Sequence, residues 1–221
     1  MKKYVEVVYD TDKRPVTEYP DLLAKEICEK FNIKKESKIL DNGCGRGDFI
    51  KAFYNYGLKC YGTDISDFSN EKIKNIPISK VDLENEKLPF EDNFFDVVFS
   101  KSVIEHMRTP DNFIKECYRV LKPGGRIILM TPDWKTTMYI FYDDFTHVQP
   151  YTVESVYDLL NMYEFKDTKS QIFYQLPIIW KNPKIIYISK ILQLFGPVKK
   201  IYKNKFLRWS RELMVLGTGI K

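Results

Sequence analysis

Short apolar runs alternate along the chain with longer stretches in which apolar residues recur every three or four positions. The runs "SKILD", "KCYGTDI", "ISKVDL", "FFDVVFSK", "RIILMT", "SQIFYQL" and "ELMVLGTGI" predict seven strands. Helical spacing, as at Leu23, Ile27 and Phe31, predicts helices between them. Because strands and helices alternate, we expect an α/β fold with a doubly wound, mostly parallel sheet and helices on both faces.

Local end signals predict where several helices begin and stop. "DFIKAFYNYG" is expected to end at Gly57, and "SDFSNEKIK" to form a short helix. Thr109-Pro110-Asp111 predicts a helix start with a capping hydroxyl, and "KPGG" a stop after Leu121. Thr152 is expected to open another helix, which buries Val153, Val156, Tyr157 and Leu160.

The composition is that of a globular protein with a packed core. The 221 residues, 44% of them hydrophobic, fit one domain, alone or with an appendage. Four scattered cysteines without a CxxC pair predict reduced thiols. The start, "MKKYVEVVYD", lacks a signal-peptide core, and no run approaches the roughly 18 apolar residues of a spanning helix. We therefore expect a cytoplasmic location.

Three glycines and two acids follow the first predicted strand in "ILDNGCGRGDF". Gly43, Gly45 and Gly47 alternate with other residues, and Asp41 and Asp48 flank them. In a doubly wound sheet, ligands bind beyond the carboxyl ends of the strands, and glycine lets the backbone come close to them. An ordinary turn is the alternative interpretation.

Two further aspartates end neighbouring predicted strands and favour a ligand site. Asp64 ends the second strand, 21 residues after Gly43, where an acid can accept hydrogen bonds from ribose hydroxyls. A helix-capping role before "SDFSN" is its alternative. Asp82 ends the third strand and would face the base of a nucleoside.

Four motifs in order, "ILDNGCGRGDF", "GTDIS", "VDLENEKLPFEDNFFDVVFSKSVIEHM" and "RVLKPGGRIILMTP", resemble the class I S-adenosylmethionine-dependent methyltransferases. The likeness is to small, single-domain, type 11-like members, and it covers residues 21–176 and the last strand. It implies a seven-stranded Rossmann-like sheet with an antiparallel last strand. Asn42 departs from the family's loop pattern, in which an apolar residue is more usual, and is expected to affect packing rather than binding.

The resemblance implies S-adenosylmethionine as the cofactor and assigns its contacts. The backbone of the loop approaches the amino-acid part, at Gly43, Cys44, Gly45 and Gly47. The resemblance places Asp41 near the ammonium group and Asp64, with Ile65, at the ribose. It places Asp82 and Leu83 around the adenine, and Ser100 below the methyl group. His106 is expected to shape the cofactor pocket, with a catalytic base or simple packing as alternatives.

Two other functions stay open beside methyl transfer. A nicotinamide oxidoreductase would need Gly-x-Gly-x-x-Gly, but here the third glycine comes one residue early. Carboxylates beside the loop also disfavour a pyrophosphate and suit a ligand with an ammonium. The second alternative is a module that binds the cofactor or a membrane without catalysis.

His147, in "DDFTHVQPYT", is the candidate catalytic residue, as a substrate contact or a base. Its alternative is a loop histidine that caps the next helix. "THVQPYT" resembles family members that act on sugars or other small polar molecules, so we expect a small-molecule acceptor, such as a sugar or a lipid-linked precursor. Asp143 and Asp144 lie nearby, but the cluster lacks further ligands at helical spacing, and no metal site is expected.

A basic segment departs from the compact family pattern. No Asp or Glu occurs from Thr168 to Arg211, where ten Lys and Arg give +10 and leave −5 for the rest of the chain. We divide the chain into an extension (1–20), a methyltransferase domain (21–176 plus 210–221) and a helical insertion (177–209). The insertion is either two packing helices or a cationic element for a membrane surface or anionic substrate. A nucleic acid is a further alternative partner of the insertion, although no recognition module or stacked aromatic platform is evident.

Overall fold

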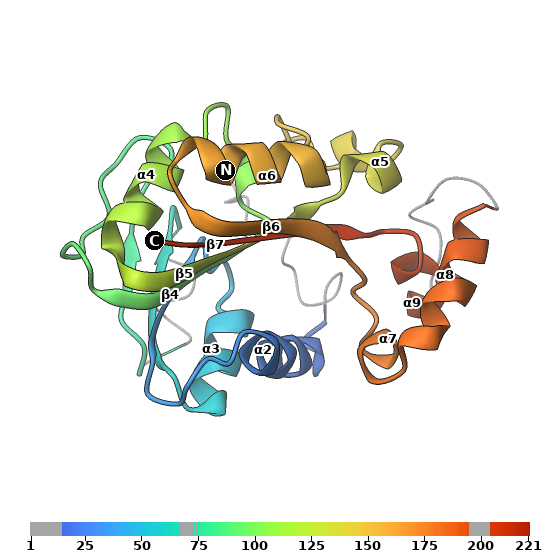
Figure 1. Ribbon diagram of the computed structural model, residues 1–221, viewed down its shortest axis with the longest axis horizontal. Coiled ribbons are helices and arrows are strands. Elements are labelled where there is room, and N and C mark those ends of the chain that lie inside the picture. The colour runs from blue at the N-terminus through green and yellow to red at the C-terminus, as the bar shows by residue number, and fades with distance from the viewer. Residues whose placement is uncertain (1–14, 67–72, 74, 195–203) are drawn as a thin grey trace.

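The computed structural model describes residues 15–66, 73, 75–194 and 204–221. They form one sheet in the order β3-β2-β1-β4-β5-β7-β6 (Figure 1). Its strands are β1 (Lys38–Asn42), β2 (Lys59–Asp64), β3 (Ile78–Lys80), β4 (Phe95–Lys101), β5 (Leu121–Pro132), β6 (Lys166–Phe173) and β7 (Met214–Ile220). β1 to β5 pair in parallel, and β7 runs antiparallel to both β5 and β6. The predicted doubly wound sheet with an antiparallel last strand is confirmed.

Helices cover both faces of this sheet. α2 (Tyr19–Lys30) and α3 (Asp48–Tyr56) lie on one face, and α4 (Asp111–Val120) and α6 (Val153–Met162) on the other (Figure 1). Each face has its own hydrophobic cluster, built in part from Leu23, Ile27, Ile50 and Phe53 and from Phe113, Ile114, Val156 and Leu160. Since burying one such side chain contributes about 1.5–3 kcal/mol, these two layers hold the sheet in place.

Most helix ends follow their local signals. α3 ends at Gly57, which has a left-handed φ of 105°. α6 begins after Thr152, whose hydroxyl accepts a hydrogen bond from the Ser155 N–H while the Ser155 hydroxyl accepts one from the Thr152 N–H. α4 ends at Val120, before "KPGG", but β5 already begins at Leu121 and therefore includes that segment.

Other local expectations were wrong. The Thr109 side chain does not cap α4; the Thr109 N–H instead donates to Glu84 Oε1 at 2.9 Å. Tyr157 is 46% exposed, because the buried face of α6 is centred on Val156 and Leu160. The third strand is shorter than "ISKVDL" and ends at Lys80. The helix expected over "SDFSNEKIK" lies mostly outside the described residues and stays a prediction.

Short helices lie at the end of the sheet where β4, β5 and β6 finish and β7 begins. η1 (Ile104–His106) follows β4, while α5 (Trp134–Thr137) and η2 (Phe141–Asp143) follow β5. Between β6 and β7 in the chain come α7 (Pro177–Lys181), η3 (Pro183–Ile185), α8 (Ile186–Gln193) and α9 (Lys205–Trp209), which gather at one end of the sheet (Figure 1). Among the described helices, none has the length and apolarity needed to cross a membrane.

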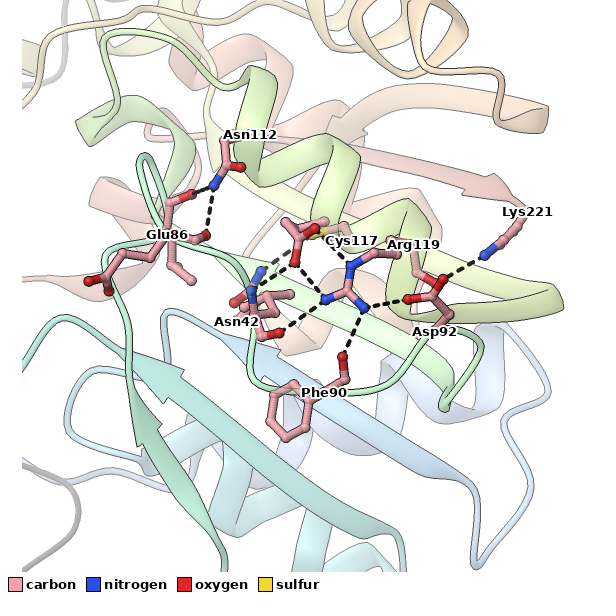
Figure 2. A network of polar contacts seen from close by, with 11 residues as sticks. Asn42, Glu86, Phe90, Asp92, Asn112, Cys117, Arg119 and Lys221 are labelled. Carbon is pink, nitrogen blue, oxygen red and sulfur yellow. Dashed lines mark hydrogen bonds and ion pairs between the residues drawn. The ribbon is translucent and has the colours of Figure 1, made fainter.

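A polar network anchors the loop that joins β3 to β4. Arg119 of α4 donates to the carbonyl oxygens of Leu88 and Phe90 and pairs with Glu116 and Asp92 (Figure 2). Because one guanidinium satisfies several loop acceptors, the loop is fixed against α4.

Asn42 belongs to the packing of this region. It is fully buried at the end of β1, and its amide donates to the Cys117 sulfur at 3.3 Å (Figure 2). Its side-chain oxygen accepts a hydrogen bond from the Thr63 hydroxyl at 2.5 Å. The residue that departs from the family's pattern therefore joins β1 to α4 and β2.

Candidate active site

The glycine loop lies at the carboxyl end of the sheet. It follows β1, and Gly43 and Cys44 both donate their N–H groups to the Thr63 carbonyl oxygen of β2 at 2.8 Å. Gly43 has a φ of +88°, and a Cβ atom there would lie 2.4 Å from Cγ2 of Val103. Only glycine therefore lets this turn pack against the segment that follows β4.

Asp41 lies beneath the loop as a buried carboxyl group. Its Oδ2 accepts no hydrogen bond from the described residues. Burial, and after it the charge of Asp64, raises the pKa of Asp41 to about 8, against smaller opposing effects of the Ile50 N–H and Lys101. A cation close to such a buried carboxyl group would stabilise its ionised form and lower its pKa.

The other two aspartates predicted to end strands lie at the same edge of the sheet. Asp64 Oδ2 accepts a hydrogen bond from the Gly45 N–H at 2.8 Å, and its Oδ1 accepts from Ser66. The Asp64 carbonyl oxygen accepts from the Val81 N–H at 2.9 Å, which brings Asp82 next to the end of β2. Asp41 and Asp64 thus lie in the neighbouring strands β1 and β2, whereas Asp82 is not the end of the third strand but follows β3, which ends at Lys80.

A cavity of about 390 Å³ opens beside the glycine loop. Its walls come from that loop, from the segment after β4, from the loop after η2 and from the start of β7. A second cavity, of about 510 Å³, lies away from the glycine loop, at the amino end of β2. The first cavity brings together the glycines and the polar side chains of the later loops, among them Gly43, Gly45, Glu105, His106 and His147.

The remaining residues assigned to the cofactor differ in accessibility. Cys44 is buried, Leu83 is half-buried against the second hydrophobic cluster, and Ile65 is 65% exposed. Ser100 is buried, and its hydroxyl donates to the Asn42 carbonyl oxygen at 2.7 Å, which ties β4 to β1. It does not line the cavity beside the glycine loop, whereas its two successors in the chain do. The cofactor roles of these residues stay predictions.

An aromatic wall of the cavity could not be foreseen from the sequence. The Tyr19 ring at the start of α2 lies 4.8 Å from the Trp209 ring of α9 and 6.3 Å from the Phe49 ring of α3, measured between centroids. Tyr19 falls in the predicted extension and Trp209 in the predicted insertion. Their only sequence signal is residue type, yet together they cover one side of the cavity.

Two histidines meet across the cavity from the loop. The ring centroids of His106 and His147 are 4.7 Å apart. His147 Nδ1 lies 2.7 Å from the Phe141 carbonyl oxygen, and His106 Nδ1 lies 2.9 Å from the Thr146 hydroxyl. Because Thr152 caps α6, His147 is not the cap that was its alternative role. Its catalytic role stays a prediction.

Glu105 is a buried neighbour that sequence reasoning passed over. Its Oε2 accepts a hydrogen bond from the Thr131 hydroxyl at 3.0 Å, while its Oε1 accepts none from the described residues. Burial raises the pKa of Glu105 to about 7, and burial lowers the pKa of His106. Perturbed titratable groups that share a cavity are typical of functional sites.

Comparison with known proteins assigns the family. Residues 40–129 match the family model described as a methyltransferase domain. An uncharacterized protein of Methanocaldococcus jannaschii is 33% identical over 199 residues, which cover 84% of this chain and 83% of the relative. A crystal structure of an S-adenosylmethionine-dependent methyltransferase from Archaeoglobus fulgidus superposes with a TM-score of 0.68 at 20% identity, over 99% and 100% of the two chains. The chain belongs to the class I, type 11-like methyltransferases.

S-adenosylmethionine is the cofactor of this family, and a structural neighbour was solved with it. This is phosphoethanolamine N-methyltransferase 2 of Haemonchus contortus, with a TM-score of 0.63 at 20% identity over 90% of this chain and 52% of the neighbour. The residues present fit such a ligand. Asp41 has a buried carboxyl oxygen without a hydrogen-bond partner among the described residues, which suits a positive ammonium, and Gly43, Cys44 and Gly45 of the adjoining loop line the cavity.

Proposed function

We propose that this protein transfers the methyl group of S-adenosylmethionine to a small polar molecule bound in the cavity beside the glycine loop. The observation that carries the proposal is that His106, His147 and Glu105 line the same cavity as Gly43 and Gly45. Methyl donor and acceptor would thus lie in one chamber, with polar side chains opposite the donor's loop. Such positioning can supply about 7–11 kcal/mol of the barrier to a displacement reaction.

The chain's own residues bind, orient and exclude water in this proposal. The cofactor supplies a methyl group that its sulfonium already activates. Asp41 holds the ammonium, Asp64 the ribose and Asp82 the adenine end. The rings of Tyr19 and Trp209 cover the cavity and keep water from the reacting atoms. His147 contacts the acceptor.

Curated relatives support a small molecule or lipid as acceptor. Sterol 4-C-methyltransferase strm-1 of Caenorhabditis elegans is 35% identical over 111 residues, and phosphoethanolamine N-methyltransferase 1 of Zea mays is 33% identical over 115 residues. The aligned parts cover 33% and 22% of those two proteins. Within this range we favour a polar acceptor, a sugar or a lipid-linked precursor, because imidazoles and a carboxyl group line the chamber.

Methyl-labelled S-adenosylmethionine tests the proposal. The purified protein is incubated with the labelled cofactor and a small-molecule cell extract, and the products are separated by mass. We expect label in low-mass products with the wild type and a loss of that label with His147→Ala. Label confined to macromolecules would contradict the acceptor class, and cofactor binding without any transfer would favour the catalytically silent module. A fluorescence titration with a reduced nicotinamide, expected to show no binding, tests the oxidoreductase.

We further propose that α8 rests on an anionic lipid surface. The exposed fractions of Tyr187, Ile188, Ile191 and Leu194 are 66%, 51%, 55% and 81%. The polar Ser189 instead faces the protein, with its hydroxyl 3.1 Å from that of Ser210. Amphipathic helices with apolar outer residues and lysines are typical of membrane interfaces.

The positive charge around α8 favours binding to a lipid surface of negative charge. Lys181, Lys184 and Lys190 are exposed on α7, η3 and α8, and no acid occurs between Thr168 and Arg211. Juxtaposed lysines add about 1 kcal/mol each near an anionic leaflet. A lipid-linked acceptor would then reach the cavity from the surface on which the protein rests.

A further inference from the structure

Three potential metal ligands converge in the cavity from two separate segments. Glu105 and His106 are neighbours in η1, and His147 follows η2. Each offers one donor atom, and the three atoms all lie within 4.8 Å of one another. A tetrahedral ion with ligand bonds of about 2.1 Å needs donor atoms about 3.4 Å apart, so side-chain rotations would bring these three onto a common centre.

Hydrogen bonds hold both imidazoles in one tautomer. A carbonyl oxygen can only accept, so His147 Nδ1 must donate to the Phe141 oxygen, 2.7 Å away. The Thr146 hydroxyl donates to Asp144 Oδ1 at 2.7 Å, and it therefore accepts from His106 Nδ1. In the neutral form of each ring these bonds place the proton on Nδ1 and leave the lone pair on Nε2. Metal-binding histidines are typically oriented in this way, by a hydrogen bond from the other ring nitrogen.

Glu105 supplies an unpaired oxygen to the same place. Its side chain is fully buried, Oε2 is occupied by the Thr131 hydroxyl, and Oε1 has no hydrogen-bond partner among the described residues. A buried carboxyl oxygen without a hydrogen-bond partner is destabilising, because it has lost its contacts with water. A bound cation would remove that destabilisation.

We propose that Glu105, His106 and His147 together bind one divalent transition-metal ion of the Zn²⁺ type. Two imidazoles and one carboxylate suit Zn²⁺, Co²⁺ or Fe²⁺, whereas Mg²⁺ and Ca²⁺ prefer sites made of oxygen ligands. Three protein ligands leave a coordination position for an acceptor oxygen or nitrogen on the cavity side. The proposed metal site consists of these three side chains, and the proposal does not depend on the identity of the methyl acceptor.

Metal titration of the full-length protein tests the assignment without any methyl acceptor. After dialysis against a chelator, Zn²⁺ is titrated by calorimetry, and Co²⁺ is followed through its visible absorption. We expect one ion per chain and an absorption spectrum of nitrogen and oxygen ligands without a thiolate band. Zn²⁺ should also raise the thermal unfolding midpoint, because it binds only the folded state.

Substitutions then locate the ion. Glu105→Gln and His147→Ala should each abolish the Zn²⁺-dependent rise in the unfolding midpoint, and Thr146→Val should weaken binding about 10–100-fold by removing the partner of His106 Nδ1. Cys44→Ser, which changes a thiol that also lines the cavity, is the matched control and should bind Zn²⁺ as the wild type does. Circular dichroism checks that each variant is folded.

Two results would overturn the site. One is a folded wild type that binds neither Zn²⁺ nor Co²⁺ at millimolar concentration. The other is binding that survives both Glu105→Gln and His147→Ala, or that disappears in Cys44→Ser. Neither result bears on methyl transfer, since the label assay measures that function separately.

Discussion

The backbone N–H of Gly45 donates a hydrogen bond to Oδ2 of Asp64 at 2.8 Å. This bond joins the middle of the glycine loop to the end of β2. The backbone N–H and the hydroxyl of Ser66 both donate to the other carboxylate oxygen, Oδ1, at 2.9 Å and 2.7 Å. Because both oxygens are oriented before a ligand arrives, less conformational entropy is lost when the ligand binds.

Asp64→Ala should therefore weaken S-adenosylmethionine binding. Hydrogen bonds to a charged group contribute about 1.5–3 kcal/mol, so we expect a dissociation constant about 10–100-fold higher in isothermal titration. Asp158→Ala, which removes an exposed carboxylate on α6, is the control and should bind as the wild type does. An unchanged dissociation constant in Asp64→Ala would contradict the ribose role.

Asp41 should make the protein less stable as the pH rises. Its pKa is about 8 in the folded protein and near 3.9 in an unfolded chain. Between these values the folded state retains a proton that the unfolded state has released. The free energy of unfolding should therefore fall with pH across this window, by up to about 1.4 kcal/mol per pH unit.

Urea denaturation at pH 5, 6, 7 and 8 measures this effect when the wild type is compared with Asp41→Asn. The variant keeps the size of the side chain but cannot ionise. The free energy of unfolding of the wild type, relative to that of the variant, should therefore fall as the pH rises. A difference between the two proteins that stays constant with pH would mean that Asp41 does not titrate in this range.

The sheet and its ligand edge could be predicted from the sequence because their signals are local. Apolar runs mark the strands, and Asp64 is marked by its position at a strand end and its spacing from Gly43. Ser100 shows the limit of such signals. Its place at the tip of β4 was predicted, but only the structure shows that its hydroxyl turns into the sheet, toward Asn42.

Features that depend on contacts between distant segments could not be predicted. The neighbours of His147 in sequence predict no group of metal ligands, yet the fold brings Glu105 and His106 of η1 next to it, with one donor atom of each within 4.8 Å of the others. The spacing of apolar residues predicts that α8 is an amphipathic helix. In the structure, however, its buried residue is the polar Ser189. Periodicity identifies an amphipathic helix, and only tertiary contacts decide which face is covered.

Gly43→Ala should destabilise the protein and weaken cofactor binding together. The new methyl group meets Val103 Cγ2 at 2.4 Å, whereas at Gly124, which has a similar left-handed φ of +79°, a Cβ meets nothing within 4 Å. Gly124→Ala thus controls for backbone strain of about 1–2 kcal/mol. We expect Gly43→Ala to lose about 1–3 kcal/mol more in urea unfolding.

A second substitution separates the clash from other effects. Val103→Ala in the Gly43→Ala background should restore part of the lost stability, because it removes the methyl groups that the new Cβ meets. If the two changes are simply additive, close packing of the loop on Val103 does not explain the requirement for glycine.

Co-sedimentation with vesicles tests the lipid surface of α8. We expect the wild type to pellet with vesicles that contain phosphatidylglycerol, and to do so less with phosphatidylcholine alone or at high salt. Replacing both Ile188 and Ile191 by serine should abolish pelleting, since burial of such side chains contributes about 1.5–3 kcal/mol each. Met162→Ser, at a position 73% exposed on α6, is the control and should pellet like the wild type.

The lysines around α8 should make vesicle binding depend on the negative charge of the lipid. Lys184→Gln and Lys190→Gln should each weaken binding to the anionic vesicles about fivefold, which corresponds to about 1 kcal/mol per charge. They should leave the weaker binding to neutral vesicles unchanged, because only the charge has been removed. Equal pelleting with neutral and anionic lipid, or a wild type that never pellets, would mean that the exposed face of α8 does not meet such a membrane.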